Sequence, residues 1–527
     1  MTKEILTLND MLDAAAAERG PRTALVTRDE SLTFSEFRDR TLKTAAGFSK
    51  RGVRPGDCVA IVARNSVDFL LAYFGLCRLG AVAVPINYMV QKADELAYML
   101  NDCRAVGVVT QKEFLKGLRG AAAKTPSMTH LWVMDAPLEE CHDKEEIFSA
   151  LLGADLDALP RVEVKEQDTA CILYTSGTTG HPKGAMLTHR NFVANSAACV
   201  NDLGLRQDDV SICLLPMFHS FAWTASVLVA LRLGHKLVIS TNITPAKPWL
   251  KLMARHGVTL IVCVPQIYAI LAKEATGFKG LVMRWWFFRK VRVAVSGAAP
   301  LSPGILQAFH AAFHIQILEG YGLTETSPVV TANTLKDRKP GSVGRPITGV
   351  RIKLVDEEER ELPIGEEGEI CIAGPNVMKG YLNLPEATRE AFTQDGWLKT
   401  GDIGLIDPEG FLFIRDRKKD MIIVKGLKVF SAQVEAVLSE HPDVQEAAVI
   451  GIPDEHGDEL IKAFVIPRKG ASPDKAALLA FCRRKLDPYK RPRDIEIVES
   501  LPKNALQKVL KRALRLQELR KRATDAP

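Results

Sequence analysis

Two hydrophobic patterns alternate along the first 300 residues. Apolar runs of strand length (55–63, 81–86 and 105–110) flank longer segments with apolar residues at helical spacing, such as NSVDFLLAYFGLCRLG (65–80). Helices that separate strands in this way are typical of parallel sheets covered by helices. After a polar stretch the pattern resumes at ACILYTSG, SICLLP, KLVIS, VTLIVCVP and VRVAVSG. The sequence therefore predicts an α/β fold with two doubly wound subdomains.

The character of the chain changes after about Pro340. From there to Ile414, short apolar runs lie between dense Gly, Pro and Asp turn signals, which indicates a small β subdomain. A charged segment, RDRKKD (415–420), follows, and a new α/β pattern continues to the last residue. We expect a large N-terminal domain of residues 1–416 and a small, mobile C-terminal α/β domain of residues 417–527.

Composition narrows the class of protein. Hydrophobic residues make up 47% and charged residues 25%, which excludes global disorder. The net charge of +6 is too small an excess to indicate a nucleic-acid binder. The ten cysteines form no Cys-x-x-Cys pair, so we interpret them as reduced thiols of a cytoplasmic protein. The uncharged stretch Val210–Leu231 is interrupted by Pro216 and His219, so a buried strand and helix fit it better than a membrane span.

The first segment that indicates chemistry is YTSGTTGHPKG, from Tyr174 to Gly184, directly after a predicted strand. Its glycines expose backbone N–H groups, its hydroxyls are small donors, and Lys183 adds a cation, which together suit a polyphosphate. The Walker pattern is excluded because Pro182 stands where it requires glycine. The candidate phosphate-binding residues are Thr175, Ser176, Gly177, Thr178, Thr179, Gly180 and Lys183.

This segment resembles the phosphate loop of the adenylate-forming superfamily, which includes acyl-CoA synthetases, aryl-CoA ligases, luciferases and peptide-synthetase adenylation domains. Further segments resemble the superfamily's motifs in the same order, and the resemblance covers nearly the whole chain. They are PMFHSFAW (216–223), SGAAPL (296–301), EGYGLTE (319–325), GEICIAGPNVMKGYLNLPEAT (368–388), WLKTGD (397–402), DRKKDMIIVKGLKVF (416–430) and LPKNALQKVLKR (501–512). The resemblance implies ATP, Mg²⁺ and coenzyme A as cofactors.

The nucleotide contacts follow from the resemblance together with side-chain chemistry. Tyr321 can cover the adenine face, Thr324 can bond a phosphate oxygen, and Glu325 offers the hard anionic oxygen that Mg²⁺ prefers. Asp402 resembles the carboxylate that receives both ribose hydroxyls, and Arg417 resembles a second ribose contact. The other expected nucleotide contacts are Gly297, Ala298, Glu319, Gly320 and Gly322.

Two residues of PMFHSFAW resemble the acyl-binding part of the family site. His219 matches a gate between the carboxylate pocket and the thiol tunnel, and Trp223 matches a tryptophan that guards the fatty-acid tunnel of long-chain synthetases. Each also has a structural alternative, because a histidine or tryptophan within an apolar run can serve simply as a core residue.

The C-terminal motifs imply a domain that moves. Lys508 matches the lysine that reaches the reacting carboxylate and α-phosphate, although Gln507 stands where the family usually has glycine. Lys419 matches the hinge residue, while Lys425 and Gly426 match the segment that approaches the pantetheine. The resemblance implies that rotation about the hinge exchanges these groups between the two half-reactions.

The expected reaction is ATP-dependent activation of a carboxylic acid as acyl-AMP, with release of pyrophosphate, followed by transfer of the acyl group to coenzyme A. His219, Lys183, Glu325 and Lys508 are the candidate catalytic residues. PMFHSFAW and the Val/Leu-rich helix after it favour a medium- or long-chain fatty acid. An aryl-CoA ligase and a fatty acyl-AMP ligase that serves a carrier protein remain alternatives, as does a nucleotide-binding protein without catalysis.

One segment falls outside these motifs. In VMRWWFFRKVRV (282–293), four consecutive aromatic residues are flanked by arginines and lysine. Four consecutive side chains cannot all face inward on a helix or a strand, so something must cover the others. A subunit interface, for example in a homodimer, or a neighbouring subdomain is one alternative. Peripheral docking on an anionic membrane, at its inner face, is the other.

Overall fold

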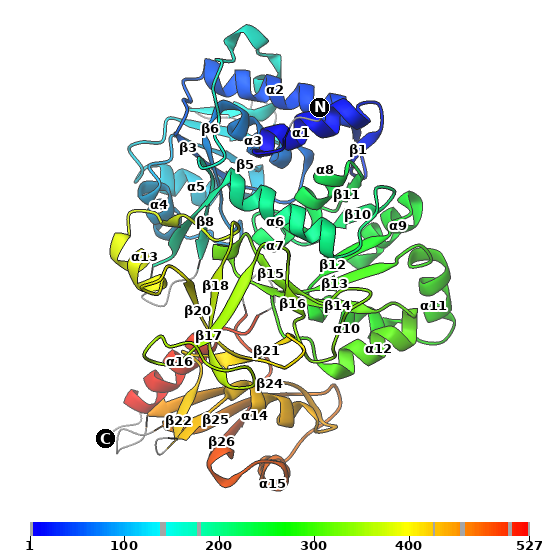
Figure 1. Ribbon diagram of the computed structural model, residues 1–527, viewed down its shortest axis with the longest axis vertical. Helices are drawn as coiled ribbons and strands as arrows, with labels where there is room; N and C mark the ends of the chain where they lie inside the picture. The colour runs from blue at the N-terminus through cyan, green and yellow to red at the C-terminus, as the bar shows by residue number, and fades with distance from the viewer. Residues whose placement is uncertain are drawn as a thin grey trace. The chain divides into compact units, whose positions relative to one another are not determined.

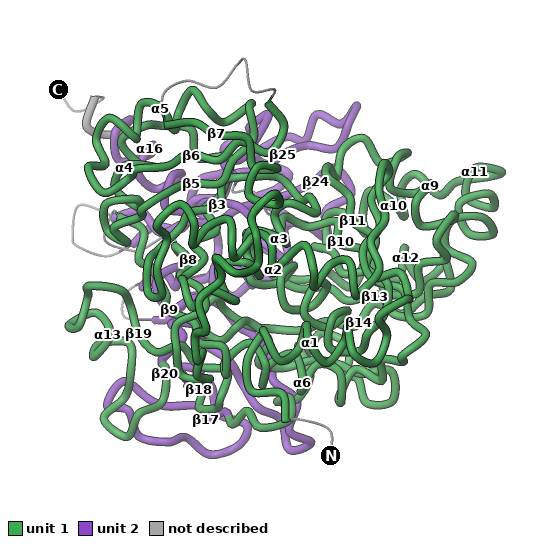
Figure 2. Tube along the Cα trace, turned by 90° about the horizontal axis from the view of Figure 1, so that it is seen from above, with its two compact units in different colours: residues 1–351, 372–398 green, residues 352–371, 399–527 purple. Residues whose placement is uncertain are grey.

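The structure is a computed structural model that describes residues 4–136, 144–175, 181–424, 427–453, 459–503 and 508–524. The chain forms two compact units, shown in green and purple in Figure 2. Unit 1 comprises residues 1–351 and 372–398, and unit 2 comprises residues 352–371 and 399–527. The expected hinge near Lys419 and the expected domain boundary at residue 416 stay predictions.

Unit 1 contains an eight-stranded sheet with a parallel centre and antiparallel pairs at one edge. Strand β8 pairs in parallel with β4 but antiparallel with β9, the next strand along the chain. In sheet order the strands are β19 (Gly380–Tyr381), β9 (Lys183–Thr188), β8 (Thr169–Thr175), β4 (Val82–Pro85), β3 (Cys58–Val62), β5 (Gly107–Thr110), β6 (His130–Val133) and β7 (Glu145–Ile147).

Helices cover both faces of this sheet, as the strand sequences require. In β3 every residue after Cys58 is buried, so both of its faces meet apolar neighbours. Ala60 and Val62 belong to the core formed with α4 (Ala93–Asp102) and α5 (Leu115–Ala122), whereas α2 (Phe34–Lys50) packs on α3 (Val67–Leu79), which contacts β3 and β4. The predicted doubly wound pattern of this region is confirmed.

A second, nine-stranded sheet of unit 1 is parallel from β1 through β14 in sheet order and ends in antiparallel strands. Figure 1 shows α10 and α12 beside its strands β13 and β14. In sheet order the strands are β16 (Arg345–Pro346), β15 (Val329–Ala332), β14 (Ile317–Gly322), β13 (Val293–Ser296), β12 (Leu260–Cys263), β10 (Val210–Cys213), β11 (Lys236–Ile239), β1 (Thr23–Val26) and β2 (Ser31–Thr33).

Amphipathic helices supply the core on one face of the nine-stranded sheet, where Trp249, Tyr268 and Phe309 are almost fully buried against strand residues. These three aromatics come from α9 (Ala246–His256), α10 (Pro265–Glu274) and α12 (Pro303–Phe313). Besides short 3-10 turns, the remaining helices in the described part of unit 1 are α1 (Leu8–Arg19), α6 (His189–Asp202), α7 (Ser220–Ala222), the π-helix η5 (Trp223–Leu228), α8 (Val229–Leu233), α11 (Gly277–Val282), the π-helix η6 (Met283–Phe287) and α13 (Pro385–Ala391).

Unit 2 contains a four-stranded sheet, in the order β17 (Arg351–Val355), β18 (Glu367–Ala373), β20 (Leu398–Ile406), β21 (Leu412–Arg417). It also contains the pair β22 (Ile422–Val424) and β23 (Leu427–Val429), and a three-stranded sheet of β24 (Val444–Pro453), β25 (Glu459–Pro467) and β26 (Asp494–Ile497). Its helices are α14 (Ser431–Ser439), α15 (Lys475–Lys485) and α16 (Lys511–Thr524).

The region expected to form one β subdomain, residues 340–414, is divided between the units. Residues 372–398 belong to unit 1, where the short strand β19 pairs with β9 of the eight-stranded sheet. The four-stranded sheet retains the segments on either side. This return to unit 1 brings Tyr381 beside Ala185.

The structure also shows the state of the cysteines and the fold of the uncharged stretch Val210–Leu231. All nine cysteines in the described ranges are free thiols, and eight of them are buried. Within those same ranges, no helix is both long enough and apolar enough to cross a membrane. The Val210–Leu231 stretch forms β10 and the buried helical run that begins at Ser220, as expected.

Candidate active site

The candidate phosphate loop joins β8 to β9, and both of its described ends are anchored. Before the loop, the Tyr174 hydroxyl donates to Asp102 Oδ2 over 2.8 Å. After the loop, the His181 ring stacks on Tyr98 with 4.5 Å between centroids, and the Tyr98 hydroxyl donates to the Pro182 carbonyl. The predicted residues 176–180 lie outside the described residues. The hairpin therefore has fixed ends on either side of the expected phosphate loop.

Lys183 and Glu325 share one neighbour in unit 1, Tyr381. The Lys183 ammonium lies 5.1 Å from the centroid of the Tyr381 ring, and the Tyr381 hydroxyl donates to Glu325 Oε1 over 2.9 Å. Burial and the Glu325 charge raise the pKa of Tyr381, so the phenol remains a donor at neutral pH. The structure thus brings together two predicted residues through a third that sequence reasoning missed.

Tyr381 could have been noticed in the sequence, because it lies in GYLNL, within a segment that resembles the family. Nothing in that segment indicates a role for its hydroxyl, however. The role becomes visible only when β19 pairs with β9, which places Tyr381 opposite Ala185, two residues after Lys183.

The segment EGYGLTE forms β14 and the short helical turn Thr324–Thr326 that follows it. Buried amides fix this turn, because Asn376 donates to the Thr326 carbonyl over 2.9 Å and Asn195 donates to the Val329 carbonyl over 2.7 Å. Gly322 has no alternative, since a Cβ there would lie 1.8 Å from the Pro328 carbonyl oxygen. Thr324 and Glu325 are therefore held on a rigid turn at the carboxyl end of a strand.

Glu319, the first residue of that segment, is half-buried. Burial raises its pKa to about 7, even though its carboxylate accepts the Leu301 N–H. The neighbouring strand β13 ends just before Gly297 and Ala298, and Ala298 has a positive φ of 67°. A Cβ on Gly297 would lie 2.9 Å from the Phe221 ring, so glycine permits the approach of the α7 segment. Tyr321, at the end of β14, is half-buried.

His219 and Trp223 lie at the start of a buried helical run. The His219 Nδ1 accepts the Phe221 N–H, which begins α7, and burial lowers the pKa of His219 to about 4, so the ring is neutral at pH 7. Trp223 is 2% exposed and begins the π-helix η5. Its ring lies 3.9 Å from Tyr73, 5.7 Å from Phe74 and 6.2 Å from Phe69, centroid to centroid.

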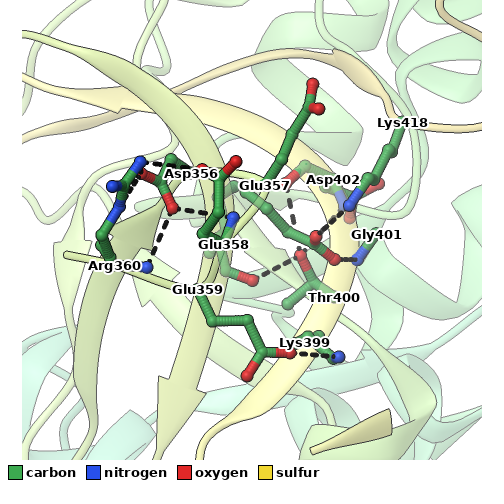
Figure 3. A network of polar contacts seen from close by, with 12 residues as sticks. Asp356, Glu357, Glu358, Glu359, Arg360, Lys399, Thr400, Gly401, Asp402 and Lys418 are labelled. Atoms are coloured by element: carbon green, nitrogen blue, oxygen red, sulfur yellow. Dashed lines mark hydrogen bonds and ion pairs between the residues drawn. The ribbon is translucent and has the colours of Figure 1, made fainter. Parts of the chain in front are cut away.

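In unit 2, Asp402 and Arg417 are direct partners across the β20–β21 pair. They face each other in register, and Arg417 Nε lies 3.3 Å from Asp402 Oδ1. The turn before Asp402 is fixed because Glu369 accepts the Gly401 N–H and pairs with Lys418 over 2.8 Å. Figure 3 shows this network, with Thr400, Gly401, Asp402 and Lys418 labelled.

Lys508 and Lys419 lie in the same electrostatic environment as this pair. Burial, followed by the positive charge of Arg417, lowers the pKa of Lys508 to about 8, while Asp402 acts in the opposite direction. Burial and Arg417 also lower the pKa of Lys419. Gln507 and the predicted Lys425 and Gly426 lie outside the described residues. Unit 2 thus gathers the expected ribose contacts and the candidate catalytic lysine.

A cleft of about 1220 Å³ also lies in unit 2, lined by both strands and helices. Its wall includes Glu357, which pairs with Lys428 over 2.7 Å, and Lys418 from the network above.

Asp416, at the end of β21, accepts hydrogen bonds from the hydroxyl of Ser431 and from the N–H of Ala432. This carboxylate ties the end of β21 to the first turn of α14.

Comparison with known proteins gives matches over nearly the whole chain. The AMP-binding enzyme family matches residues 12–382, and the AMP-binding enzyme C-terminal domain matches residues 433–508. A 4-coumarate–CoA ligase 5 of Oryza sativa subsp. japonica is 35% identical, with 97% of this chain and 94% of the relative covered. A long-chain-fatty-acid–CoA ligase of Bacillus subtilis (strain 168) is 34% identical, with the same coverage.

Solved structures agree with these relatives. The anthranilate CoA ligase AuaEII in complex with anthranoyl-AMP superposes with a TM-score of 0.87 at 30% identity, with 97% of each chain covered. ATP-bound MatB from Rhodopseudomonas palustris gives a TM-score of 0.87 at 32% identity, with 97% of this chain and 98% of that chain covered.

The environment of Lys508 gives a test that requires no substrate. An amine-selective acylating reagent attacks only the neutral amine, so labelling of Lys508 should rise through pH 8, its pKa being about 8. Arg417→Gln removes a positive neighbour, so the midpoint should move to higher pH. Mass spectrometry of the labelled peptides measures both midpoints, with exposed Lys336 as the internal reference. An unchanged midpoint in Arg417→Gln would show that Arg417 does not influence Lys508.

Proposed function

Because the chain belongs to the AMP-binding enzyme family, in its acyl-CoA synthetase branch, we propose that it activates a medium- or long-chain fatty acid and transfers the acyl group to coenzyme A. The coarser activity is established by this membership: the chain is an adenylate-forming acyl- or aryl-CoA ligase that uses ATP. The proposal concerns the acid, the metal and the role of each residue.

The apolar character of the segment around Trp223 carries the proposal for the acid. Residues 220–231 are all buried, and the sequence has no charged side chain from Leu214 to Leu231. A site lined by this segment would offer no partner for an α-amine or a second carboxylate, whereas an alkyl chain gains about 0.8 kcal/mol for each CH₂ group it buries. The long-chain-fatty-acid–CoA ligases among the relatives support the same class.

An aryl acid is the second candidate. Tyr73, Phe74 and Phe69 pack around Trp223, and aromatic side chains of this kind favour contact with a substrate ring. The 4-coumarate and anthranilate ligases among the similar proteins favour this candidate. A fatty acyl-AMP ligase that serves a carrier protein would differ in the second half-reaction only.

The deciding experiment is acid-dependent pyrophosphate release, with mass analysis of the products in the presence of coenzyme A. A panel of alkyl acids of increasing length and of aryl acids compares kcat/KM. We expect the highest values for medium or long alkyl acids and acyl-CoA as the product. A preference for aryl acids would assign the second candidate, and acyl-AMP that is never converted to acyl-CoA would indicate a carrier protein.

For the metal, we propose that Glu325 supplies one oxygen ligand to the Mg²⁺ that accompanies ATP. A carboxylate on a rigid turn suits this hard cation, and the bound metal would neutralise phosphate charge. Lys183 would contribute a further positive charge toward the phosphates, and Asp402 with Arg417 would hold the ribose. The loop residues 175–180, Tyr321 and Thr324 retain the nucleotide roles expected from sequence.

Tyr381→Phe tests the proposed metal ligand through its neighbour. The change removes the hydrogen bond to Glu325 Oε1 but keeps the ring beside Lys183. A hydrogen bond to a charged group contributes about 1.5–3 kcal/mol, so we expect metal binding to weaken by about tenfold or more. The half-saturating concentration of Mn²⁺, which stands in for Mg²⁺, is measured by electron paramagnetic resonance in the presence of ATP and should rise accordingly. Tyr98→Phe, which alters the loop anchor instead, is the control. Equal metal affinity in all three proteins would remove Tyr381 from this role.

Lys508→Ala tests the division of the two half-reactions. If the lysine stabilises the carboxylate and α-phosphate as they react, adenylate formation should fall by about a hundredfold or more. Thioester formation from synthetic acyl-AMP and coenzyme A should change little, because that step does not need the lysine. Pyrophosphate exchange measures the first step and acyl-CoA formation the second, with Lys469→Ala, an exposed lysine of unit 2, as the control. Equal loss of both steps would contradict the proposed role.

Trp223→Ala tests the acyl tunnel. The truncation removes the ring that contacts Tyr73 and should shift the preferred chain length toward longer acids while ATP binding stays the same. Because such a truncation costs about 3–5 kcal/mol of stability, Trp249→Ala is the matched control. Trp249 is equally buried in unit 1, and its truncation should lower stability without a change in chain-length profile. The same profile in wild type and Trp223→Ala would make Trp223 a core aromatic only.

A further inference from the structure

An exposed apolar patch lies on three consecutive short elements of unit 1: the end of α10, α11 and η6. Its most exposed members are Phe278 (81%), Trp286 (67%) and Trp285 (64%). These three are the exposed Phe and Trp side chains of the described residues. The patch also includes Ile270, Leu281 and Val282. Monomeric proteins rarely concentrate large apolar side chains in this way without a partner.

The four consecutive aromatic residues, 285–288, differ in their exposure to solvent. Phe288 is buried, with its ring 4.3 Å from Phe313, and Phe287 is half-buried against the same core. Trp285 and Trp286 face outward. Met283, 5% exposed, anchors the π-helix from its inner side, so the two tryptophans project from a backbone that the core fixes.

Basic side chains surround the patch. Residues 270–290 contain five lysines and arginines and one acid, Glu274, which pairs with Lys279. The Arg284 guanidinium lies 5.5 Å from the Trp285 ring centroid. The adjoining helix α9 contacts η6 and adds exposed Lys247, Lys251 and Arg255 at four-residue spacing, hence on one face. The five basic residues of the segment are Lys273, Lys279, Arg284, Arg289 and Lys290.

We propose that this patch, residues 270–290 with the basic face of α9, is a docking surface for an anionic phospholipid bilayer. Tryptophan favours the headgroup boundary because its ring is apolar and its N–H is polar, and the surrounding cations complement lipid phosphates. A flat bilayer also suits the location of the patch, since α11 lies at the outer edge of unit 1 in both Figure 1 and Figure 2. A second copy of this chain would bring the same excess of positive charge to the contact.

The docking surface does not depend on the proposed acid, because none of its residues belongs to the candidate active site. If the acid is a long-chain fatty acid, docking would also place the enzyme where that acid partitions. Shallow docking of this kind needs both signals, apolar side chains and cations, because neither alone gives firm binding.

The test measures binding of the full-length protein to vesicles of phosphatidylcholine alone and of phosphatidylcholine with phosphatidylglycerol. We expect co-sedimentation with the anionic vesicles, weakened by salt, and little with the neutral ones. Of the six tryptophans, Trp132, Trp223 and Trp249 are buried and Trp397 is half-buried. Blue-shifted emission and quenching by brominated lipid should therefore arise from Trp285 and Trp286.

Two pairs of variants separate the contributions. Trp285→Ser with Trp286→Ser should lower partitioning into anionic vesicles by about tenfold or more and abolish the quenching. Arg284→Gln with Arg289→Gln should lower partitioning into anionic vesicles at low ionic strength by about fivefold for each cation removed. Leu156→Ser with Ile364→Ser, exposed apolar residues elsewhere, and Lys43→Gln with Lys336→Gln are the matched controls and should bind as wild type does.

Three results would overturn the proposal. The first is no binding to anionic vesicles even at low ionic strength. The second is binding to anionic vesicles that is the same in wild type and in Trp285→Ser with Trp286→Ser. The third is a dimer in sedimentation equilibrium that the same pair dissociates, since that would assign the patch to a second copy of the chain. Turnover of a short, water-soluble acid should be the same in all variants, which keeps loss of docking distinct from any failure of the proposed activity.

Discussion

Parallel strands end at a common edge of their sheet, and the candidate site of unit 1 depends on this constraint. In the nine-stranded sheet, β10, β13 and β14 are parallel members, and their carboxyl ends lead to His219, Gly297 and Glu325. Segments more than a hundred residues apart therefore share one edge without any long-range sequence signal. In the other sheet, β8 leads to the expected phosphate loop in the same way.

Buried amides convert this common edge into fixed positions. Asn191 donates to the carbonyls of Pro375 and Val377, Asn195 exchanges hydrogen bonds with Val329, and Asn376 donates to Thr326. Irregular backbone inside a protein must find such partners, because an unpaired carbonyl costs free energy there. The three asparagines thus hold the Glu325 turn and the segment leading to Tyr381 against α6.

The sequence was sufficient for the parts of the fold that have a strong periodicity. Strands β3, β4, β5, β11, β12 and β13 lie within the apolar runs that predicted them, β8 and β10 each begin one residue before theirs, and the family assignment is confirmed. The return of residues 372–398 to unit 1 was not predictable, because its turn-rich composition continues that of its neighbours. Tyr381 and the three asparagines were missed for a related reason: their roles depend on long-range partners, which no local spacing reveals.

Strands of the two large sheets of unit 1 also carry thiols: Cys171 in β8, Cys213 in β10 and Cys263 in β12. Burial raises the pKa of Cys171 and Cys213 to about 12 and raises that of Cys263 as well, so all three remain protonated at neutral pH. An acyl-adenylate is a strong electrophile, and a cysteine attacks it rapidly only as the thiolate. An enzyme that makes such a mixed anhydride thereby keeps these three cysteines from competing for the acyl group, which is left for the thiol that arrives from solution.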